Sequence, residues 1–144
     1  MKAEAYLQLK GRHEKEMNEF PIAYAFDSKQ LEEALEKLGA TKEECVTVFN
    51  IGDVMKKTDV PAFKAMLKRH KEELLEAMKN EEFAEEAFLY EMNNHEYAIN
   101  WSGDEDVLAC FNMNETKLHD MNLVGAYRRA RREHMRIAEE WGII

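Results

Sequence analysis

Residues 45–56 read CVTVFNIGDVMK, and this stretch decides the fold class. Residues 45–51 are rich in β-branched and aromatic side chains, which favour a strand. Gly52 and Asp53 can then turn the chain back into a second strand over 54–57. The stretch therefore predicts a β-hairpin in a chain that is otherwise dominated by helical periodicity.

The segments on either side of the hairpin alternate between helical and strand patterns. Asp27 or Ser28 is a good cap for a helix that ends at Gly39, and Pro21 ends the helix before it. The predicted helices are 3–19, 28–38, 60–78, 81–93, 104–111 and 120–141, and further strands are predicted at 20–26 and 97–101. We expect an α+β fold with about six helices packed around a small antiparallel sheet of three to four short strands, and a single domain over residues 1–144.

Composition indicates a folded protein and excludes several classes. The 144 residues are 45% hydrophobic and 34% charged, with a net charge of −9. This charge disfavours binding to duplex nucleic acid or to an anionic membrane. Neither a signal-peptide pattern nor a membrane span is visible, so we expect a cytoplasmic protein. Cys45 and Cys110 stand outside any CxxC spacing and are expected to be reduced thiols in the core.

The acidic residues are concentrated in one segment. Residues 81–106 contain nine Asp and Glu and no Lys or Arg, which accounts for the whole net charge. One interpretation is an ordinary solvated helix face. The other is a surface for a basic partner, with carboxylates for steering and aromatic side chains for anchoring. Its candidate residues are Glu81, Glu82, Glu85, Glu86, Glu91, Tyr90, Tyr97 and Trp101.

The C-terminal helix carries the opposite charge, with five Arg and one Glu between residues 128 and 136. Like charges on one helix face repel, so an anion should lie nearby. Carboxylates of the protein itself could supply it through surface ion pairs. Alternatively, the guanidinium groups could bind a phosphate or carboxylate ligand bidentately. The candidate residues for this anion site are Tyr127, Arg128, Arg129, Arg132 and Arg136, with Tyr127 stacking on a base.

No motif indicates catalysis, and we expect no enzyme, cofactor or metal. His13, His70 and His134 fall on apolar stripes and are interpreted as hydrogen-bonded core residues. His95 is expected to cap the fourth helix. Glu91 and His95 stand four residues apart and could form an acid–base pair. Because no Ser, Thr or Cys nucleophile stands beside them in the sequence, they do not predict an active site.

Three stretches together resemble a known family: AYAFDSKQLEEALEKLG (23–39), GDVMKKTDVPAFKAMLKRHKEEL (52–74) and NNHEYAINWSGDEDVLACF (93–111). They are similar to small uncharacterised proteins of Firmicute bacteria and their phages. The resemblance implies no catalytic residues. It implies a context in which such proteins bind host machinery, including defence nucleases or their nucleotide signals.

Our leading hypothesis is a non-enzymatic binding protein. It would inhibit a host protein that handles nucleic acid, such as a phage-defence nuclease, through the acidic and aromatic segment. The first alternative is a receptor that sequesters a nucleotide or another small anion on the arginine helix. The second alternative is a housekeeping interaction domain that forms a homo-oligomer.

Overall fold

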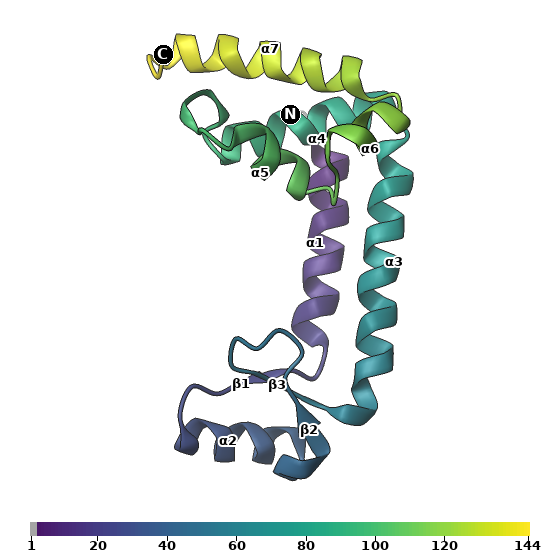
Figure 1. Ribbon diagram of the computed structural model, residues 1–144, viewed down its shortest axis with the longest axis vertical. Helices are drawn as coiled ribbons and strands as arrows, with labels where there is room; N and C mark the ends of the chain where they lie inside the picture. Colours follow the sequence, from purple (N-terminus) through teal and green to yellow (C-terminus); the bar gives the residue numbers. More distant parts are fainter. Residues whose placement is uncertain (1–2) are drawn as a thin grey trace. The chain divides into compact units, whose positions relative to one another are not determined.

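The computed structural model describes residues 3–144 and confirms the α+β class (Figure 1). Within these residues it contains seven α-helices and a sheet of three short antiparallel strands. The α-helices and strands are α1 (Glu4–Glu19), β1 (Ala23–Tyr24), α2 (Ser28–Leu38), β2 (Cys45–Val46), β3 (Asp53–Lys56), α3 (Val60–Met78), α4 (Glu81–Asn94), α5 (Gly103–Ala109), α6 (Glu115–Asp120) and α7 (Val124–Glu140). Three short 3₁₀ helices, η1 (Lys42–Glu44), η2 (Lys57–Asp59) and η3 (Tyr97–Ile99), connect them.

Contacts along the chain gather into two compact units, and each is described by itself. The sheet unit consists of residues 13–69, and the helical unit consists of the residues up to Arg12 together with residues 70–144. Helices α1 and α3 contribute residues to both units. That the whole chain folds as one domain stays a prediction.

The predicted hairpin forms in the sheet unit, but its first strand is only Cys45–Val46, and Asp53, which was predicted in the turn, begins β3. Strand β3 is the middle strand, and it pairs with β2 through Cys45 opposite Lys56 and with β1 through Ala23 opposite Val54. Helix α2 buries Ala34 against the face that carries Ala23. Met55 points to the other face, where it packs with Phe63 at the start of α3. The alternation of side chains along β3 therefore supplies two small cores.

Capping residues set the ends of α2 as predicted. The Asp27 carboxylate accepts a hydrogen bond from the Gln30 backbone N–H at 2.7 Å. Gly39 ends the helix with φ of 65°, a left-handed conformation that a glycine adopts without strain.

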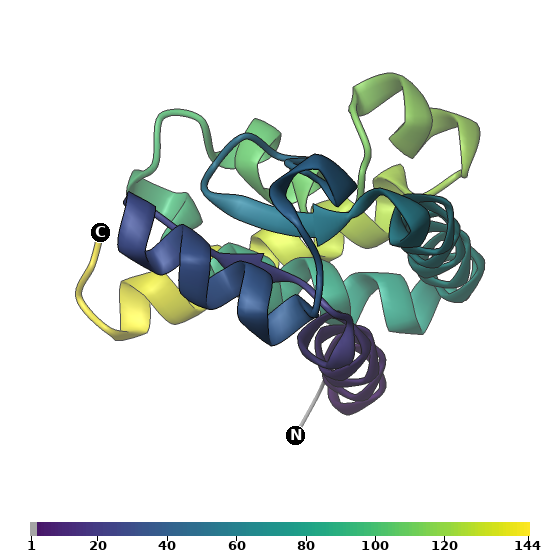
Figure 2. The same cartoon turned by 90° about the horizontal axis from the view of Figure 1, so that it is seen from below.

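The helical unit is built around α4 and α7, which lie side by side in Figures 1 and 2. Its core contains a cluster of aromatic rings among aliphatic side chains. The Phe88 ring packs edge-to-face on Phe111 of the α5 region and on Tyr127 of α7, each with ring centroids 5.1 Å apart. Tyr6 of α1 adds a further ring, 5.5 Å from Phe111. These contacts fix α4, α5 and α7 relative to one another within the unit.

Two predicted elements are wrong. The stretch 97–101 is not a strand, since Tyr97–Ile99 forms η3 and the Tyr97 side chain turns into the core. Glu96 enters this turn with φ of 51°, which breaks the extended backbone that a strand requires. The predicted helix 120–141 corresponds to α7 but begins four residues later, at Val124, because Asn122 has φ of 57° and ends the preceding helix, α6, which was not predicted.

Candidate functional site

The predicted partner residues of the acidic segment divide into buried and exposed groups. Glu91 is 1% exposed and Tyr97 is 9% exposed, so neither belongs to an accessible surface. Tyr90 is partly buried, and its ring lies 6.0 Å from that of Tyr6. Trp101, by contrast, is completely exposed. A partner surface on this segment is therefore narrower than the sequence pattern predicts, and Trp101 is its most prominent apolar group.

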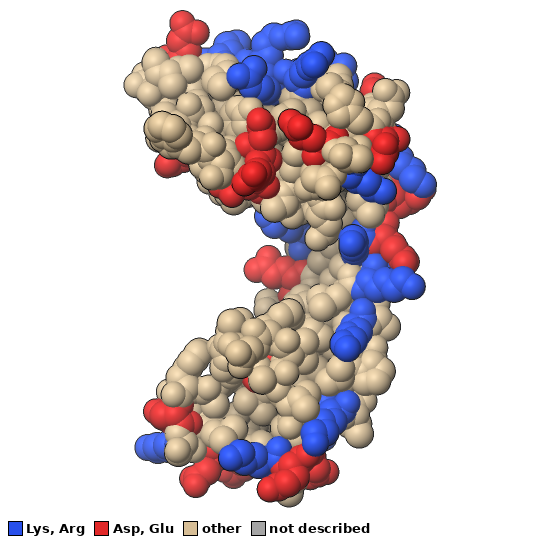
Figure 3. Space-filling view, viewed as in Figure 1, with Lys and Arg blue, Asp and Glu red and all other residues tan. Residues whose placement is uncertain are grey.

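The exposed apolar side chains of the helical unit gather at one of its ends. Ile99 and Trp101 lie in the loop before α5, and Trp141, Ile143 and Ile144 follow α7. Figures 1 and 2 both place this loop and the last residues at the same end of the unit. Figure 3 shows few charged side chains there, whereas Lys and Arg gather along α7 and Asp and Glu lie below them. We name Ile99, Trp101, Trp141, Ile143 and Ile144 the apolar end.

Hydrogen bonds hold the loop that presents Trp101 in one conformation. The Asn100 amide donates to the His95 carbonyl oxygen at 3.3 Å and to Asp106 at 2.9 Å. The Asn100 side-chain oxygen accepts from the Ser102 backbone N–H at 2.9 Å. Asn100 thus ties both sides of Trp101 to the body of the unit.

Helix α7 braces the same loop through His134. The His134 Nε2 accepts a hydrogen bond from the Ala98 backbone N–H at 3.1 Å, so the ring proton resides on Nδ1. Nδ1 lies 2.6 Å from the Asn93 side-chain oxygen and donates to it. The Tyr97 ring packs edge-to-face on the imidazole at 5.7 Å. Burial lowers the pKa of His134, which keeps the ring neutral and able to accept from Ala98.

Tyr97 and Tyr127 share one carboxylate. Both hydroxyl groups donate to the same oxygen of Asp104, at 2.7 and 2.5 Å, and Arg131 Nε donates to the Tyr97 hydroxyl at 3.1 Å. Burial and the hydrogen bond to Asp104 raise the pKa of Tyr127. Because the Tyr127 ring is buried and its hydroxyl is engaged, it cannot stack on a base as the anion-site prediction requires.

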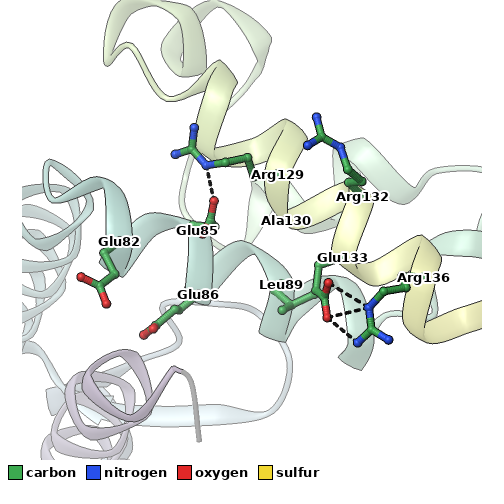
Figure 4. Close-up of a pocket in the computed structure, with 9 residues that line it drawn as sticks. All are labelled: Glu82, Glu85, Glu86, Leu89, Arg129, Ala130, Arg132, Glu133 and Arg136. Carbon is green, nitrogen blue, oxygen red and sulfur yellow. Dashed lines mark hydrogen bonds and ion pairs between the residues drawn. The ribbon is translucent and has the colours of Figure 1, made fainter.

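A pocket of about 680 Å³ lies between α4 and α7 (Figure 4). Three arginines of the predicted anion site line it, together with four carboxylates; the lining residues are Glu82, Glu85, Glu86, Leu89, Arg129, Ala130, Arg132, Glu133 and Arg136. More acids than bases therefore face this space. A lining of this kind favours a small anion less than an all-arginine pocket would.

The acidic segment and the arginine helix neutralise each other in part. Arg129 pairs with Glu85 and approaches Glu81 at 3.8 Å. Arg136 pairs within α7, with Glu133 at 2.6 Å and Glu140 at 2.9 Å. The structure records no ion pair for Arg128 or Arg132 among residues 3–144. Within the described residues, Arg128 and Arg132 of the arginine helix thus have no carboxylate within ion-pair distance, although Arg132 shares its pocket with four carboxylates.

Glu91 is a buried carboxylate that the sequence places on an ordinary helix face. Its Oε2 accepts hydrogen bonds from the Tyr6 hydroxyl and, at 2.9 Å, from the Lys10 ammonium, both on α1. Partial burial alone would lower the pKa of Lys10, but the hydrogen bond and charge of Glu91 raise it. No sequence signal could reveal this contact, because Glu91 stands 85 residues from Tyr6.

His95 ends α4 as its predicted C-cap, with its backbone N–H on the Glu91 carbonyl oxygen. Contrary to the sequence-based expectation, a thiol lies beside it: Cys110 Sγ is 3.3 Å from His95 Nε2. The Glu91 carboxylate faces the same nitrogen at 3.7 Å. In a catalytic triad the histidine contacts the nucleophile through one ring nitrogen and the carboxylate through the other. Here Nε2 faces both groups, so these three residues do not form a catalytic triad. Burial and the Glu91 charge also raise the pKa of the Cys110 thiol, which disfavours the nucleophilic thiolate.

Across residues 3–144, Glu91, His95 and Cys110 form the one group of His, Cys, Asp and Glu side chains whose ligand atoms all lie within 4.8 Å of one another. His13, His70 and His134 are not part of it. Both ring nitrogens of His134 are engaged by Asn93 and Ala98. The three histidines on apolar stripes therefore do not converge on a metal site among the described residues.

Comparison with known proteins gives a family for the chain. No helix of residues 3–144 has the length and apolar character needed to cross a bilayer. Neither the curated proteins nor the solved structures contain a significant match. Residues 5–133 match the family described as "Family of unknown function (DUF7659)". Because this match spans most of the 144 residues, the chain belongs to the DUF7659 family.

Proposed function

We propose that this protein is a non-enzymatic binding protein that engages a basic partner protein through its apolar end. The observation that carries the proposal is the complete exposure of Trp101 on a loop that Asn100 and His134 hold in place. A tryptophan contributes to the stability of a fold by being buried, and this one is not. Exposed tryptophans on ordered surfaces are typical anchors of protein interfaces.

Charge around the apolar end supports a basic partner. Glu96 and Glu105 flank the loop and are exposed, and Glu139 is exposed at the end of α7, where Glu140 pairs with Arg136. Acidic groups around an apolar centre match the usual arrangement of an interface, with a polar rim around desolvated anchors. They also steer a positively charged surface toward the loop and repel an acidic one.

The resemblance to small proteins of Firmicutes and their phages supports a narrower proposal. The partner is a host protein that handles nucleic acid, such as a defence nuclease, and the protein inhibits it by covering a basic surface. Nucleic-acid-binding proteins expose such surfaces for phosphate contacts. An acidic patch with apolar anchors competes for them.

A nucleotide or other small anion is the second candidate ligand, favoured by Arg132. This residue lines the pocket between α4 and α7, and the structure records no ion pair for it among residues 3–144. Inorganic phosphate and a nucleotide panel, titrated calorimetrically into wild type and Arg132→Gln, test this candidate. Heat and a rise in melting temperature that vanish in the variant would support it.

The main proposal is tested by mixing the protein with purified host nucleases and measuring complexes by size exclusion and biolayer interferometry. Trp101→Ala should weaken binding by about 30-fold or more, as loss of an interface anchor does. Phe26→Ala is the matched control, because Phe26 is an aromatic residue of the sheet unit and is 76% exposed. Affinity should also fall with salt.

Two results would refute the proposal. One is the absence of any complex with the nuclease panel, and the other is equal binding by wild type and Trp101→Ala. Light scattering on the protein alone addresses self-association. A dimer that Trp101→Ala dissociates would assign the apolar end to a second copy of the chain and favour the homo-oligomer alternative.

A further inference from the structure

Three metal-ligating side chains of different chemistry meet where α4 and α5 end. Glu91 lies in the last turn of α4, His95 caps that helix, and Cys110 caps α5. His95 Nε2 is 3.3 Å from Cys110 Sγ and 3.7 Å from Glu91 Oε1. All three ligand atoms lie within 4.8 Å of one another. They come from segments that are separate in sequence, so the fold itself creates the group.

Two of the three separations between these atoms are close to those around a tetrahedral transition metal. With Zn–N near 2.0 Å, Zn–S near 2.3 Å and Zn–O near 2.1 Å, neighbouring ligand atoms around tetrahedral zinc stand about 3.4 to 3.6 Å apart. The two measured separations, 3.3 and 3.7 Å, lie close to this range. A sulfur, an imidazole nitrogen and a carboxylate oxygen favour zinc over the hard cations Mg²⁺ and Ca²⁺, which take oxygen ligands.

Surrounding residues orient the Glu91 carboxylate for this role. The Tyr6 hydroxyl and the Lys10 ammonium both donate to Oε2, whereas Oε1 faces His95 at 3.7 Å and accepts a long hydrogen bond of 3.4 Å from the Asn94 side chain. Partners of this kind fix the direction of a ligating carboxylate in protein metal sites. Glu91 is 1% exposed, whereas the His95 side chain is 36% exposed. The group is therefore buried at Glu91 and accessible to solvent at His95, the side from which an ion would enter.

We propose that Glu91, His95 and Cys110 form a binding site for a thiophilic divalent cation, with Zn²⁺ as its representative. The ion would bond to Glu91 Oε1, His95 Nε2 and Cys110 Sγ, with water in the fourth position. Cys110 is a free thiol in the structure, so its proton must leave to solvent as the sulfur–metal bond forms. No electron transfer is involved. Bound metal would link the end of α4 to the end of α5, on either side of the loop that carries Trp101.

The test uses the full chain, stripped of metal with a chelator and then titrated with Zn²⁺ and Co²⁺. We expect one equivalent of Zn²⁺ to remain after gel filtration, measured by elemental mass spectrometry, with release of about one proton per ion near neutral pH. Co²⁺ should give sulfur-to-cobalt charge-transfer absorption and the intense visible bands of tetrahedral cobalt.

Matched variants assign the ligands. Cys110→Ser should abolish the charge-transfer band, and Cys45→Ser, which changes the other free cysteine, should leave it intact. His95→Gln should weaken Zn²⁺ binding at least 10-fold, and His119→Gln, at an exposed position of α6, should not. His95 is partly exposed, so its variant is expected to fold, and far-UV circular dichroism checks each protein.

The site is refuted if the wild-type protein retains no stoichiometric Zn²⁺, or if its Co²⁺ spectrum lacks the sulfur band. It is also refuted if Cys45→Ser removes that band as completely as Cys110→Ser does. In those cases the three side chains form a hydrogen-bonded cluster only. Because these readouts concern the metal alone, failure here leaves the proposed partner binding untouched, and the reverse also holds.

Discussion

Replacement of His134 by Phe tests how the fold holds the loop that presents Trp101. Phe keeps an aromatic ring for the edge-to-face contact with Tyr97, but its ring is one atom larger than imidazole and has neither nitrogen. The hydrogen bonds to the Ala98 N–H and to the Asn93 side chain, at 3.1 and 2.6 Å, are therefore lost together. The exchange removes both hydrogen bonds while it leaves an aromatic ring at the position.

The magnitude follows from the two lost bonds. Each contributes about 1 kcal/mol net, and the half-buried Ala98 N–H left without a partner adds a desolvation cost of the same order. We expect His134→Phe to lower the free energy of unfolding by about 2 to 4 kcal/mol in urea denaturation followed by far-UV circular dichroism. The hydrogen-exchange rate of the Ala98 amide should also increase. His119→Phe, at an exposed position, should change stability by less than about 0.5 kcal/mol.

Lowering the pH should reproduce part of the loss of stability that we expect for His134→Phe. Burial lowers the pKa of His134 below its ordinary value of 6.5, so the unfolded chain binds this proton more readily than the folded protein. The stabilisation is complete above pH 6.5 and is lost as pH falls through the pKa of the folded protein. Protonated Nε2 can no longer accept from Ala98, and the amide should exchange faster at pH 5 than its intrinsic chemistry dictates.

Two observations would contradict this reasoning. The first is a His134→Phe protein as stable as wild type at pH 7. The second is a free energy of unfolding that changes between pH 7 and 5 by the same amount in the variant as in wild type. The variant has no group at this position to titrate, so its change should be smaller. Either result would mean that the Ala98 contact does not contribute to the free energy of unfolding.

Three further substitutions probe other parts of the fold, each with urea denaturation. Asp53→Asn should lower the free energy of unfolding by about 2 to 3 kcal/mol, because the Asp53 carboxylate accepts hydrogen bonds from the backbone N–H groups of residues 48, 49 and 51 and from the Thr47 hydroxyl. Asp27→Asn is its control and should leave stability almost unchanged, since Asn caps helices as well as Asp. Burial alone would raise the pKa of Asp53, but these hydrogen bonds lower it, so wild type should lose this stabilisation as pH falls below about 4 and the variant should not. Gly103→Ala should lower the free energy of unfolding by about 1 to 3 kcal/mol, since its Cβ would stand 2.8 Å from the Tyr97 ring. Gly11→Ala is its control: this position inside α1 has open space around it, so the substitution should leave stability unchanged or increase it. Arg129→Ala should cost less than about 1 kcal/mol, because its pairs with Glu85 and Glu81 are exposed; a larger loss would show that the two charged segments hold α4 and α7 together.

Features that depend on neighbouring residues were predictable from the sequence. The hairpin at 45–56 and the caps of α2 are examples, since Gly52, Asp27 and Gly39 act within a few residues of their own positions. The β-rich composition of 97–101 misled the same reasoning. There the Tyr97 ring packs closely against Gly103, and the Ala98 N–H turns to His134, so tertiary contacts override the local preference.

Contacts between distant segments explain what the sequence could not show about the sites. Cys110 reaches His95 only because α5 folds back on α4, and no spacing motif encodes that return. Glu91 looks like one of nine solvated acids until Tyr6 and Lys10 of α1 cover it. The charge pattern left two sources of anions open for the arginine helix, and the pair of Arg129 with Glu85 shows that a carboxylate of 81–106 supplies part of the compensation.

The constraints on residues 97–102 bear directly on how tightly the apolar end could bind a partner. Two helices fix this loop: Asp106 and Gly103 of α5 contact Asn100 and the Tyr97 ring, and His134 of α7 accepts from the Ala98 N–H. Ordering a residue's backbone costs about 1 to 2 kcal/mol, so a flexible loop of this length would lose roughly 6 kcal/mol or more on binding, about 10⁴-fold in affinity. In this protein the loop is already ordered before a partner binds, so binding does not lose that conformational entropy. Variants that loosen the loop while leaving Trp101 in place, His134→Phe above all, should therefore weaken partner binding without removing a single interface contact.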